Sequence, residues 1–404
     1  MEDQKSLFRW FVLILAVVNL MLGMVSKQSI PPLFSEIQMQ IPLTKTQMGT
    51  TMGVVSLASL FFAVFGGALA DRFGSRMVFG GAILLMAVFG GLRGFAETAY
   101  GFIAMMFILG AGAAILGPSL LKALGTWFPS SQLAMANGIC ISSMGVGGAL
   151  AMATAAKHLS PACDGWRGLM FVLGALLAFT GIIWMVLYKD VPKKAGETVK
   201  KNKGNVRGNF KKVLRVKEVW LIALFYACCN MGLISAISFL PIIFEERGLT
   251  KAGEAVAVFL GVSVLFNIAG GILSDKLGKR KLFLWSSALV IGLCVPFFGV
   301  LNGGLLILVL VIAGAAMGTF APIMMAVPHE LEKVGPALAG TSIGFIFMIG
   351  NVGGFIGPVF TGKIMDLTGT YWSGLIFMTI CFIAASLIVV PLRETGRASQ
   401  QEQP

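Results

Sequence analysis

Two lysines lie inside stretches of the sequence that are otherwise almost entirely apolar. Lys27 shares one face of a predicted helix with Asn19 and Gly23, because residues spaced four apart lie on the same side of a helix. Lys122 lies near the end of a second apolar stretch. An ammonium group in an apolar environment requires an anion, a polar cavity or a path to the aqueous surface. These lysines predict anion binding, and extension of each side chain to the surface is the alternative interpretation.

Neutral polar side chains occur in several other apolar stretches. Tyr226 and Asn230 share one helical face, and Asn351 lies near the middle of its stretch. Each such side chain alone can form a hydrogen bond between helices. Combined with the lysines, they predict a small polar pocket. The predicted binding residues are Lys27, Asn19, Lys122, Ser143, Tyr226, Asn230 and Asn351.

The apolar stretches determine where these residues can lie. Apolar residues make up 57% of the chain, charged residues only 12%, and there are 51 glycines, unlike a soluble domain. A helix needs about 20 mostly apolar residues to cross a membrane, and unbroken runs of this length favour helices over β-barrel strands. The sequence predicts an all-α membrane protein with twelve transmembrane helices, near residues 9–33, 47–70, 77–95, 101–125, 134–156, 168–188, 219–243, 254–274, 282–300, 304–327, 338–360 and 371–391.

A long polar segment, 189–218, separates the first six predicted helices from the second six. It contains eleven Lys and Arg and three acids. With a cytoplasmic N-terminus, 22 of the 31 Lys and Arg fall in cytoplasmic segments, in agreement with the positive-inside rule. We therefore expect an inner-membrane protein with both termini cytoplasmic. Its parts are an N-terminal bundle (1–188), a basic cytoplasmic linker (189–218), a C-terminal bundle (219–391) and a cytoplasmic tail (392–404).

The net charge of +13 follows mainly from this topology. The basic linker is expected to lie near anionic lipid head groups, and no aromatic-rich basic fold supports binding to nucleic acid. Arg93 ends the run 77–95 and is predicted to anchor at the membrane interface. The expected partners are a small-molecule ligand and membrane lipids. The protein is expected to be a monomer.

Acidic residues and metal-binding residues narrow the chemistry further. All 18 Asp and Glu lie at or outside the helix boundaries, so no buried carboxylate is expected to bind a cation or relay protons. His158 and His329 lie far apart, and only Cys163 of the six cysteines falls in a predicted outer loop. The chain lacks a phosphate-binding G-x-x-x-x-G-K-[ST] loop. We expect no metal, no cofactor, no ATP-driven pump and no enzyme.

The two halves of the chain repeat each other. "AGAA" occurs at 111–114 and 313–316, and "GVGG" at 145–148 is echoed by "NVGG" at 351–354, with offsets of 202 and 206 residues. Asp71 and Asp275 are separated by 204 residues in two near copies of one loop. These offsets indicate a duplicated set of six helices, which is typical of transporters with a site near the membrane midplane.

The loop copies are "GGALADRFGSR" at 66–76 and "GGILSDKLGKR" at 270–280. They resemble the loop between helices 2 and 3 of the major facilitator superfamily and its repeat between helices 8 and 9. "FILGAGAAILGP" resembles that family's glycine-rich fourth helix, although Met106 stands where many proton-coupled members carry arginine. The resemblance covers essentially the whole chain and implies secondary transport by alternating access, without supporting proton coupling.

The repeated loop predicts a conformational latch. Its glycines allow close helix packing, and its aspartates can accept hydrogen bonds at helix N-termini, where the helix dipole favours an anion. A tight basic turn that only fixes topology is the alternative. The predicted latch residues are Asp71, Arg72, Arg76, Asp275, Lys276 and Arg280.

Glycine-rich runs in two helices give a second, more distant resemblance. "IGNVGGFIGP" and "MGVGGALA" resemble the corresponding helices of nitrate/nitrite porters, which bind their anion with arginines in helices 2 and 8. Monocarboxylate transporters also use an arginine in helix 8, where this chain offers only Asn267. The second and eighth predicted helices of this chain contain no arginine, so nitrate is disfavoured as the substrate.

A small organic anion such as a carboxylate is the predicted substrate, transported by alternating access. Two alternatives stay open at this stage. One is an exporter of amphipathic or cationic compounds, for which Met317, Met324 and Met325 would form an adaptable pocket or merely fill gaps in the core. The other is a membrane sensor that transports nothing. Transport direction and coupling ion do not follow from the residues.

Overall fold

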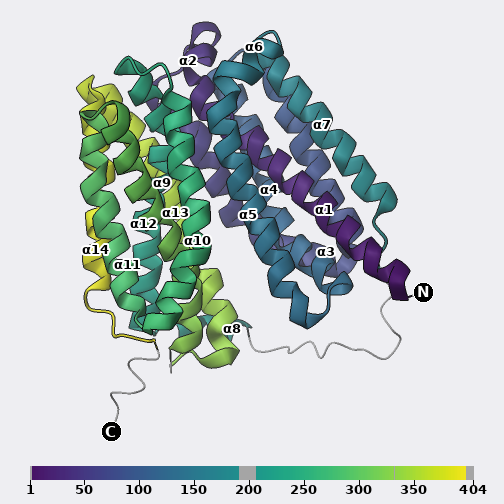
Figure 1. The fold of residues 1–404 in the computed structure, drawn as a ribbon. Helices are drawn as coiled ribbons and strands as arrows, with labels where there is room; N and C mark the ends of the chain where they lie inside the picture. Colours follow the sequence, from purple (N-terminus) through teal and green to yellow (C-terminus); the bar gives the residue numbers. More distant parts are fainter. Residues whose placement is uncertain (1, 191–205, 332, 397–404) are drawn as a thin grey trace. The chain divides into compact units, whose positions relative to one another are not determined.

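The computed structural model describes residues 2–190, 206–331 and 333–396, and these residues are predominantly helical (Figure 1). Three short helical turns, η1 (Arg93–Phe95), η2 (Ala155–Leu159) and η3 (Val295–Gly299), extend or link the longer elements. The α-helices are α1 (Glu2–Gln28), α2 (Ile30–Gln40), α3 (Lys45–Leu92), α4 (Ala99–Trp127), α5 (Ser130–Thr154), α6 (Ser160–Ala162), α7 (Trp166–Leu187), α8 (Val206–Val213), α9 (Lys217–Glu246), α10 (Ala252–Leu277), α11 (Arg280–Cys294), α12 (Gly303–Glu330), α13 (Gly335–Thr368) and α14 (Tyr371–Val389).

The predicted helical membrane protein is confirmed. Within the described residues, 11 helices are long and apolar enough to cross a membrane. The longest of them, α3, covers two predicted runs and is interrupted at Gly74, whose φ of 84° and ψ of 158° are not helical. Because 48 residues of helix would extend about 72 Å, far beyond the roughly 30 Å hydrocarbon core, α3 provides two spans. The twelve-helix arrangement follows.

Local sequence signals explain where several helices begin. Thr44 and Gln47 form a reciprocal capping box at the start of α3, in which the Thr44 hydroxyl accepts from the Gln47 backbone N–H and the Gln47 side chain accepts from the Thr44 N–H. The structure differs from the predicted single helix over 9–33, because the helix is interrupted at Ser29, between α1 and α2. Two prolines in the first turn of α2 have no N–H to donate to the preceding turn, which favours a new helix there.

The chain divides into two compact units. Unit 1 contains residues 1–193 and 244–257, and unit 2 contains residues 194–243 and 258–404. In unit 1, α3 packs against α4 and α7, and α1 packs against α5. In unit 2, α11 packs against α12 and α14 (Figure 1).

Part of the connection between α9 and α10 groups with unit 1. This segment, Phe244–Ala257, is held there by charged side chains. Glu246 pairs with Lys45. The Lys157 Nζ lies 2.9 Å from the Glu254 Oε1. These pairs fix the segment to the same unit as α1 to α7.

Glycines allow α13 to lie directly against α9 in unit 2. A Cβ atom added at Gly353 would lie 2.8 Å from the Ala227 Cα, and one added at Gly357 would lie 2.5 Å from the Met231 Cα. Farther along, the Thr361 hydroxyl donates to the Ser235 hydroxyl at 2.8 Å. The glycine-rich run of α13 therefore brings two backbones close together, as small residues do between membrane helices.

The predicted basic linker lies partly outside the described residues, which resume at 206. Its described part contains α8, which packs against α13 through Phe210 and Phe345, with ring centroids 5.9 Å apart. The Trp220 indole N–H donates to the Leu214 carbonyl oxygen at 3.0 Å, just after α8. Most of the predicted tail, 397–404, also lies outside the described residues.

Candidate functional site

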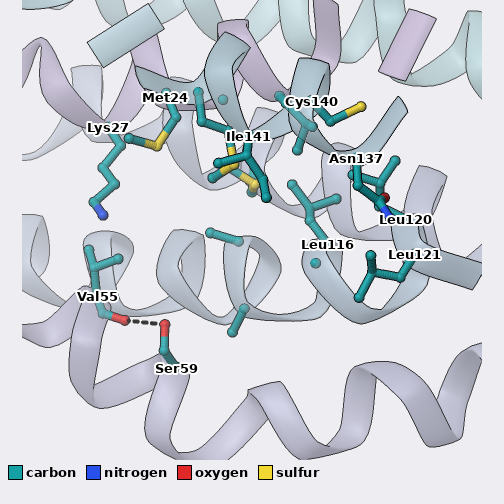
Figure 2. Close-up of a pocket in the computed structure, with 17 residues that line it drawn as sticks. Met24, Lys27, Val55, Ser59, Leu116, Leu120, Leu121, Asn137, Cys140 and Ile141 are labelled. Atoms are coloured by element: carbon teal, nitrogen blue, oxygen red, sulfur yellow. Dashed lines mark hydrogen bonds between the residues drawn. The ribbon is translucent and has the colours of Figure 1, made fainter. Parts of the chain in front are cut away.

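Unit 1 contains a cavity of about 360 Å³ lined by α1, α3, α4 and α5 (Figure 2). This volume lies at the lower end of the range for small-molecule sites. Three lining residues carry a charged, hydroxyl or amide side chain: Lys27, Ser59 and Asn137. Most of the remaining wall consists of aliphatic and methionine side chains, among them Met24 and Leu116. The cavity is therefore mainly apolar, with a few polar groups.

Lys27 is the only predicted binding residue that lines this cavity. Its half-buried side chain extends toward the turn of α3 that contains Val55 and Ser59 (Figure 2). Among the described residues it has no hydrogen-bond or ion-pair partner, and no acidic residue lines the cavity. The Ser59 hydroxyl donates to the Val55 carbonyl oxygen at 3.0 Å. An ammonium group in such a surrounding attracts an anion.

Arg93 is fully buried, with 0% of its surface exposed, so its predicted role as an interface anchor is wrong. Its guanidinium donates to the Ser26 carbonyl oxygen at 3.0 Å and to the Ser26 hydroxyl at 2.8 Å. It also donates to the Gly90 carbonyl oxygen at 3.0 Å and lies 3.1 Å from the Met106 sulfur. All four acceptors are neutral, which is how the helix end can bury a group that normally lies at the interface.

The position of Met106 gives Arg93 further interest. By its resemblance to the family, Met106 stands at a position where many proton-coupled transporters carry arginine. In this chain the guanidinium next to that position belongs to Arg93, which directly follows α3. Arg93 donates to the Ser26 hydroxyl, and Lys27 is the residue after Ser26. Unit 1 thus holds two cationic groups close together. Lys27 is half-buried on α1, and Arg93 is fully buried next to α1.

Two other predicted binding residues on unit 1 use their side chains in hydrogen bonds within the protein. Asn19 is fully buried, donates to the Leu15 carbonyl oxygen at 2.8 Å and accepts from the Thr180 hydroxyl at 2.8 Å. It therefore joins α1 to α7. Ser143 donates to the Cys140 carbonyl oxygen at 2.7 Å, one turn from cavity-lining residues.

Lys122 lies at the repeated loop rather than in the cavity. Its Nζ is 3.0 Å from the Asp71 Oδ1, and it also donates to the Ala70 carbonyl oxygen. The pair joins α4 to α3 just before the kink at Gly74. Sequence spacing places Lys122 on a helix face, but it does not reveal that Asp71 lies opposite.

A carboxylate from another part of the chain caps the helix that begins after Gly74. The Asp190 side chain accepts from the backbone N–H of Ser75 at 3.1 Å and of Arg76 at 3.3 Å. The Arg76 Nε donates to the Met185 carbonyl oxygen at 2.5 Å. An anion at a helix N-terminus is favoured by the free N–H groups and the helix dipole.

The second loop copy is capped in the same way. Gly278 has a φ of 63°, and the next helix begins at Arg280, whose N–H donates to the Glu394 Oε1 at 2.5 Å. Asp190 and Glu394 are 204 residues apart, the same offset as between the two loop aspartates. The capping carboxylate is therefore part of the duplication, although it lies outside the repeated stretch of sequence.

The loop aspartates form ion pairs with different partners in the two copies. In the second copy, the Arg280 Nη1 lies 2.7 Å from the Asp275 Oδ1, and the Arg280 Nη2 lies 2.7 Å from the Glu330 Oε1. Arg72 lies over the ring of Phe73, 5.2 Å from its centroid. Lys276, the last predicted latch residue, is exposed.

The three predicted binding residues of unit 2 lie on α9 and α13, where Tyr226 links the two helices. The Tyr226 ring contacts Phe347 edge-on, with centroids 5.5 Å apart, and the Tyr226 and Asn230 side chains interact. The Asn351 amide donates to the Phe347 carbonyl oxygen at 3.0 Å. The structure thus brings these three together on α9 and α13.

Sequence reasoning missed Ser59 and Asn137. Asn137 is on one face of α5 with Cys140 and Met144, at spacings of three and four residues, and all three line the cavity. The same spacing argument that selected Lys27 and Asn19 would have found Asn137. Ser59 is one turn from Val55 on α3, in a run that contains no charge to draw attention to it.

Comparisons with known proteins agree with this architecture. The model of the Major Facilitator Superfamily matches residues 11–358 and 250–404. A hexuronate transporter of Bacillus subtilis (strain 168) is 29% identical over 385 residues, covering 88% of this chain and 87% of the relative. A nitrite extrusion protein of the same organism is 27% identical over 384 residues, covering 92% of each chain.

A solved structure shows the same fold. It is a bacterial homolog to the human lysosomal transporter Spinster in an inward-facing and occupied conformation, with a TM-score of 0.76 and 16% identity. The alignment covers 95% of this chain and 94% of that chain. The likeness shows the fold, and the family match over most of the chain shows that the chain belongs to the Major Facilitator Superfamily of membrane transporters, which are not enzymes.

Proposed function

We propose that this secondary transporter moves a small organic anion, first of all a carboxylate, and that Lys27 binds its charged group. The observation that carries the proposal is the Lys27 side chain in the cavity, without an acidic partner among the described residues. At about 4 Å, attraction between two unit charges is worth roughly 4 kcal/mol at an effective dielectric constant of 20, before desolvation is subtracted. Part of that energy can contribute to affinity.

The buried Arg93 supports an anionic substrate. Its partners are neutral acceptors, so its positive charge is not cancelled by any carboxylate that bonds to it in the described chain. A cation entering this cavity would meet the Lys27 ammonium and no acid, with the buried Arg93 guanidinium close by at Ser26, which disfavours the cationic exporter. The relatives named for hexuronate and nitrite transport both carry names of anions, in agreement with this proposal.

The proposed topology places both termini in the cytoplasm of a cell that carries the protein in its inner membrane. Its support is the distribution of Lys and Arg, 22 of 31 on the side of the basic linker. A monomer in contact with membrane lipids is the simplest assembly for the two-bundle architecture.

We also propose that the two capped loops act as cytoplasmic latches during alternating access. Each copy combines an aspartate in an ion pair, a positive-φ glycine and a helix capped by a distant carboxylate. Such contacts can hold helix ends together in one state and release them in another.

Binding to the purified protein tests the anion proposal. We expect Lys27→Gln to weaken the binding of a carboxylate by about tenfold or more, because the ammonium is replaced by a neutral group of similar length. Lys212→Gln, at an exposed lysine of α8, is the matched control and should leave the affinity unchanged. Equal affinities in the Lys27 variant and the control, for every carboxylate that binds, would refute the proposal.

A further inference from the structure

Lys27 lies at the end of a helix, where the backbone has few internal hydrogen bonds. α1 ends at Gln28, and the last carbonyl groups of a helix lack the N–H donors that a further turn would supply. Pro31 and Pro32 lie in the first turn of the next helix, α2. Because proline has no N–H, these two residues cannot donate to the Lys27 and Gln28 carbonyl oxygens, as residues 31 and 32 of a continuous helix would. The backbone around Lys27 therefore depends on other groups to hold it in place.

Arg93 provides such a group one residue before Lys27. Its Nη2 donates to the Ser26 carbonyl oxygen at 3.0 Å and to the Ser26 hydroxyl at 2.8 Å. The Ser29 hydroxyl donates to the same carbonyl oxygen at 3.2 Å. Arg93, Ser26 and Ser29 are all fully buried. The Ser26 carbonyl belongs to the peptide group that joins Ser26 to Lys27, so the guanidinium fixes the backbone directly before the Lys27 side chain.

The same guanidinium is bound to two other helices of the cavity. Its Nε donates to the Gly90 carbonyl oxygen, in the last turn of α3, at 3.0 Å, and its Nη1 lies 3.1 Å from the Met106 sulfur of α4. A Cβ added at Gly90 would lie 3.2 Å from the Ser26 Oγ, so α1 and α3 approach closely here. The planar fork of donors thus joins the end of α1 to α3 and α4, which line the same cavity.

We infer that Arg93 is a positioning residue for Lys27. By fixing the peptide group between Ser26 and Lys27, it holds the Lys27 ammonium in the cavity, directed toward α3 (Figure 2). Arg93 is fully buried and is not among the residues that line the cavity, so it does not touch the anion itself. This inference rests on the proposed binding of an anion by Lys27 and adds the group that places the ammonium.

Backbone hydrogen exchange at the end of α1 tests the first step. Arg93→Lys keeps the positive charge and loses the fork of donors, so amide exchange in a peptide covering residues 24–34 should rise by about three- to tenfold. Arg167→Lys is the matched control, because the Arg167 Nε donates to the Gln40 side chain at 2.7 Å and its Nη1 to the Gly94 carbonyl oxygen at 2.6 Å. It should leave this peptide unchanged. Equal exchange in Arg93→Lys and the unmodified protein would overturn the inference.

A double-mutant cycle tests whether the effect passes through Lys27. Affinities of the purified protein are measured for hexanoate and glucuronate. Arg93→Lys should weaken binding by about three- to tenfold, because a displaced ammonium loses part of its attraction for the carboxylate, and Arg167→Lys should not. In the Lys27→Gln background Arg93→Lys should cause no further loss, since no ammonium remains to be placed. The same fold-loss in both backgrounds would show a merely structural role and overturn the inference.

Ser26→Ala provides a milder variant, which removes the hydroxyl acceptor and leaves every charge in place. It should weaken binding by about twofold in the unmodified protein and not at all in the Lys27→Gln background. If Lys27→Gln weakens binding but Arg93→Lys and Ser26→Ala do not, the inference falls alone. If Lys27→Gln leaves both affinities unchanged, the proposed function falls, and the inference falls with it.

Discussion

Two cationic residues of unit 1, Arg93 and Lys27, differ in the partners that surround their charged groups. Arg93 directs its N–H groups to neutral oxygens and a sulfur, so its hydrogen-bonding capacity is used within the protein. Lys27 has no such partners among the described residues and faces the cavity. The first arrangement stabilises the helix ends, whereas the second leaves a charge available for a ligand.

Arg93→Lys tests the structural role of the guanidinium. A lysine keeps the charge but cannot reach the Ser26 carbonyl, the Ser26 hydroxyl and the Gly90 carbonyl together, because it lacks the planar fork of donors. We expect a loss of about 1–3 kcal/mol in the free energy of unfolding, measured by denaturation of the purified protein. Arg72→Lys, at an exposed position over Phe73, is the control. Equal stability of the two variants would contradict the account.

Sequence alone identified Lys27 as a residue of the candidate site, but not its neighbours. Asn19 and Lys122 met the same criteria and are bonded to Thr180 and Asp71, partners that lie far away in the sequence. Helical periodicity gives the face of a side chain and not the element that lies opposite. Asn137 could have been predicted from its spacing, because its amide shares a face with Cys140 on α5.

Among the elements, the helices that follow the two loop copies have the most informative starts. Each begins after a glycine with positive φ, Gly74 or Gly278, and each is capped by a carboxylate far along the chain. A side chain at either glycine would be strained in this backbone conformation. The caps tie the segment after the sixth span to the third span, and the segment after the twelfth span to the ninth.

Removing a cap should affect transport more than binding. In Asp190→Asn and Glu394→Gln the charge at the helix N-terminus is lost, which costs about 0.5–2 kcal/mol for a capping group. We expect the transport rate in proteoliposomes to fall several-fold, while the affinity for the carboxylate changes by less than about twofold. Glu97→Gln, at an exposed acid in a loop of unit 1, serves as the control. Unchanged transport in both cap variants would leave the loops with a role in topology alone.

The helices themselves were largely predictable, because hydropathy and length determine which runs cross a membrane. The break between α1 and α2 was missed, although Pro31 and Pro32 signal it. The merging of two predicted runs into α3 was not foreseen either. Gly74 there turns the chain within a single residue, so almost no non-helical segment separates the two spans.

At the scale of the whole molecule, duplication explains both the architecture and its asymmetry. The two units share the loop, its glycine and its capping carboxylate at an offset of 204 residues. They differ in their polar residues: unit 1 presents Lys27 in a cavity, whereas unit 2 carries Tyr226 and Asn230 on α9 and Asn351 on α13. If the proposed roles hold, the repeated halves keep the latch and diverge in the groups proposed to contact the solute.

The proposed topology can be tested by labelling. Cys163 is partly exposed near α6, and Lys212 is exposed on α8. A membrane-impermeant maleimide added to intact cells should label the protein, and Cys163→Ser should abolish that labelling. A cysteine at position 212 in the Cys163→Ser background should react only after permeabilisation. Labelling of that cysteine in intact cells would reverse the orientation.

Exchange of a labelled carboxylate across proteoliposomes tests the central claim most directly. Vesicles loaded with unlabelled carboxylate and containing the unmodified protein should accumulate the labelled one, because a secondary transporter exchanges its substrate. Vesicles containing Lys27→Gln should show at least about tenfold less exchange at substrate concentrations below saturation, and those containing Lys212→Gln should match the unmodified protein. Equal exchange by the Lys27 variant, at equal protein content, would contradict the assignment of Lys27 as the group that binds the transported anion.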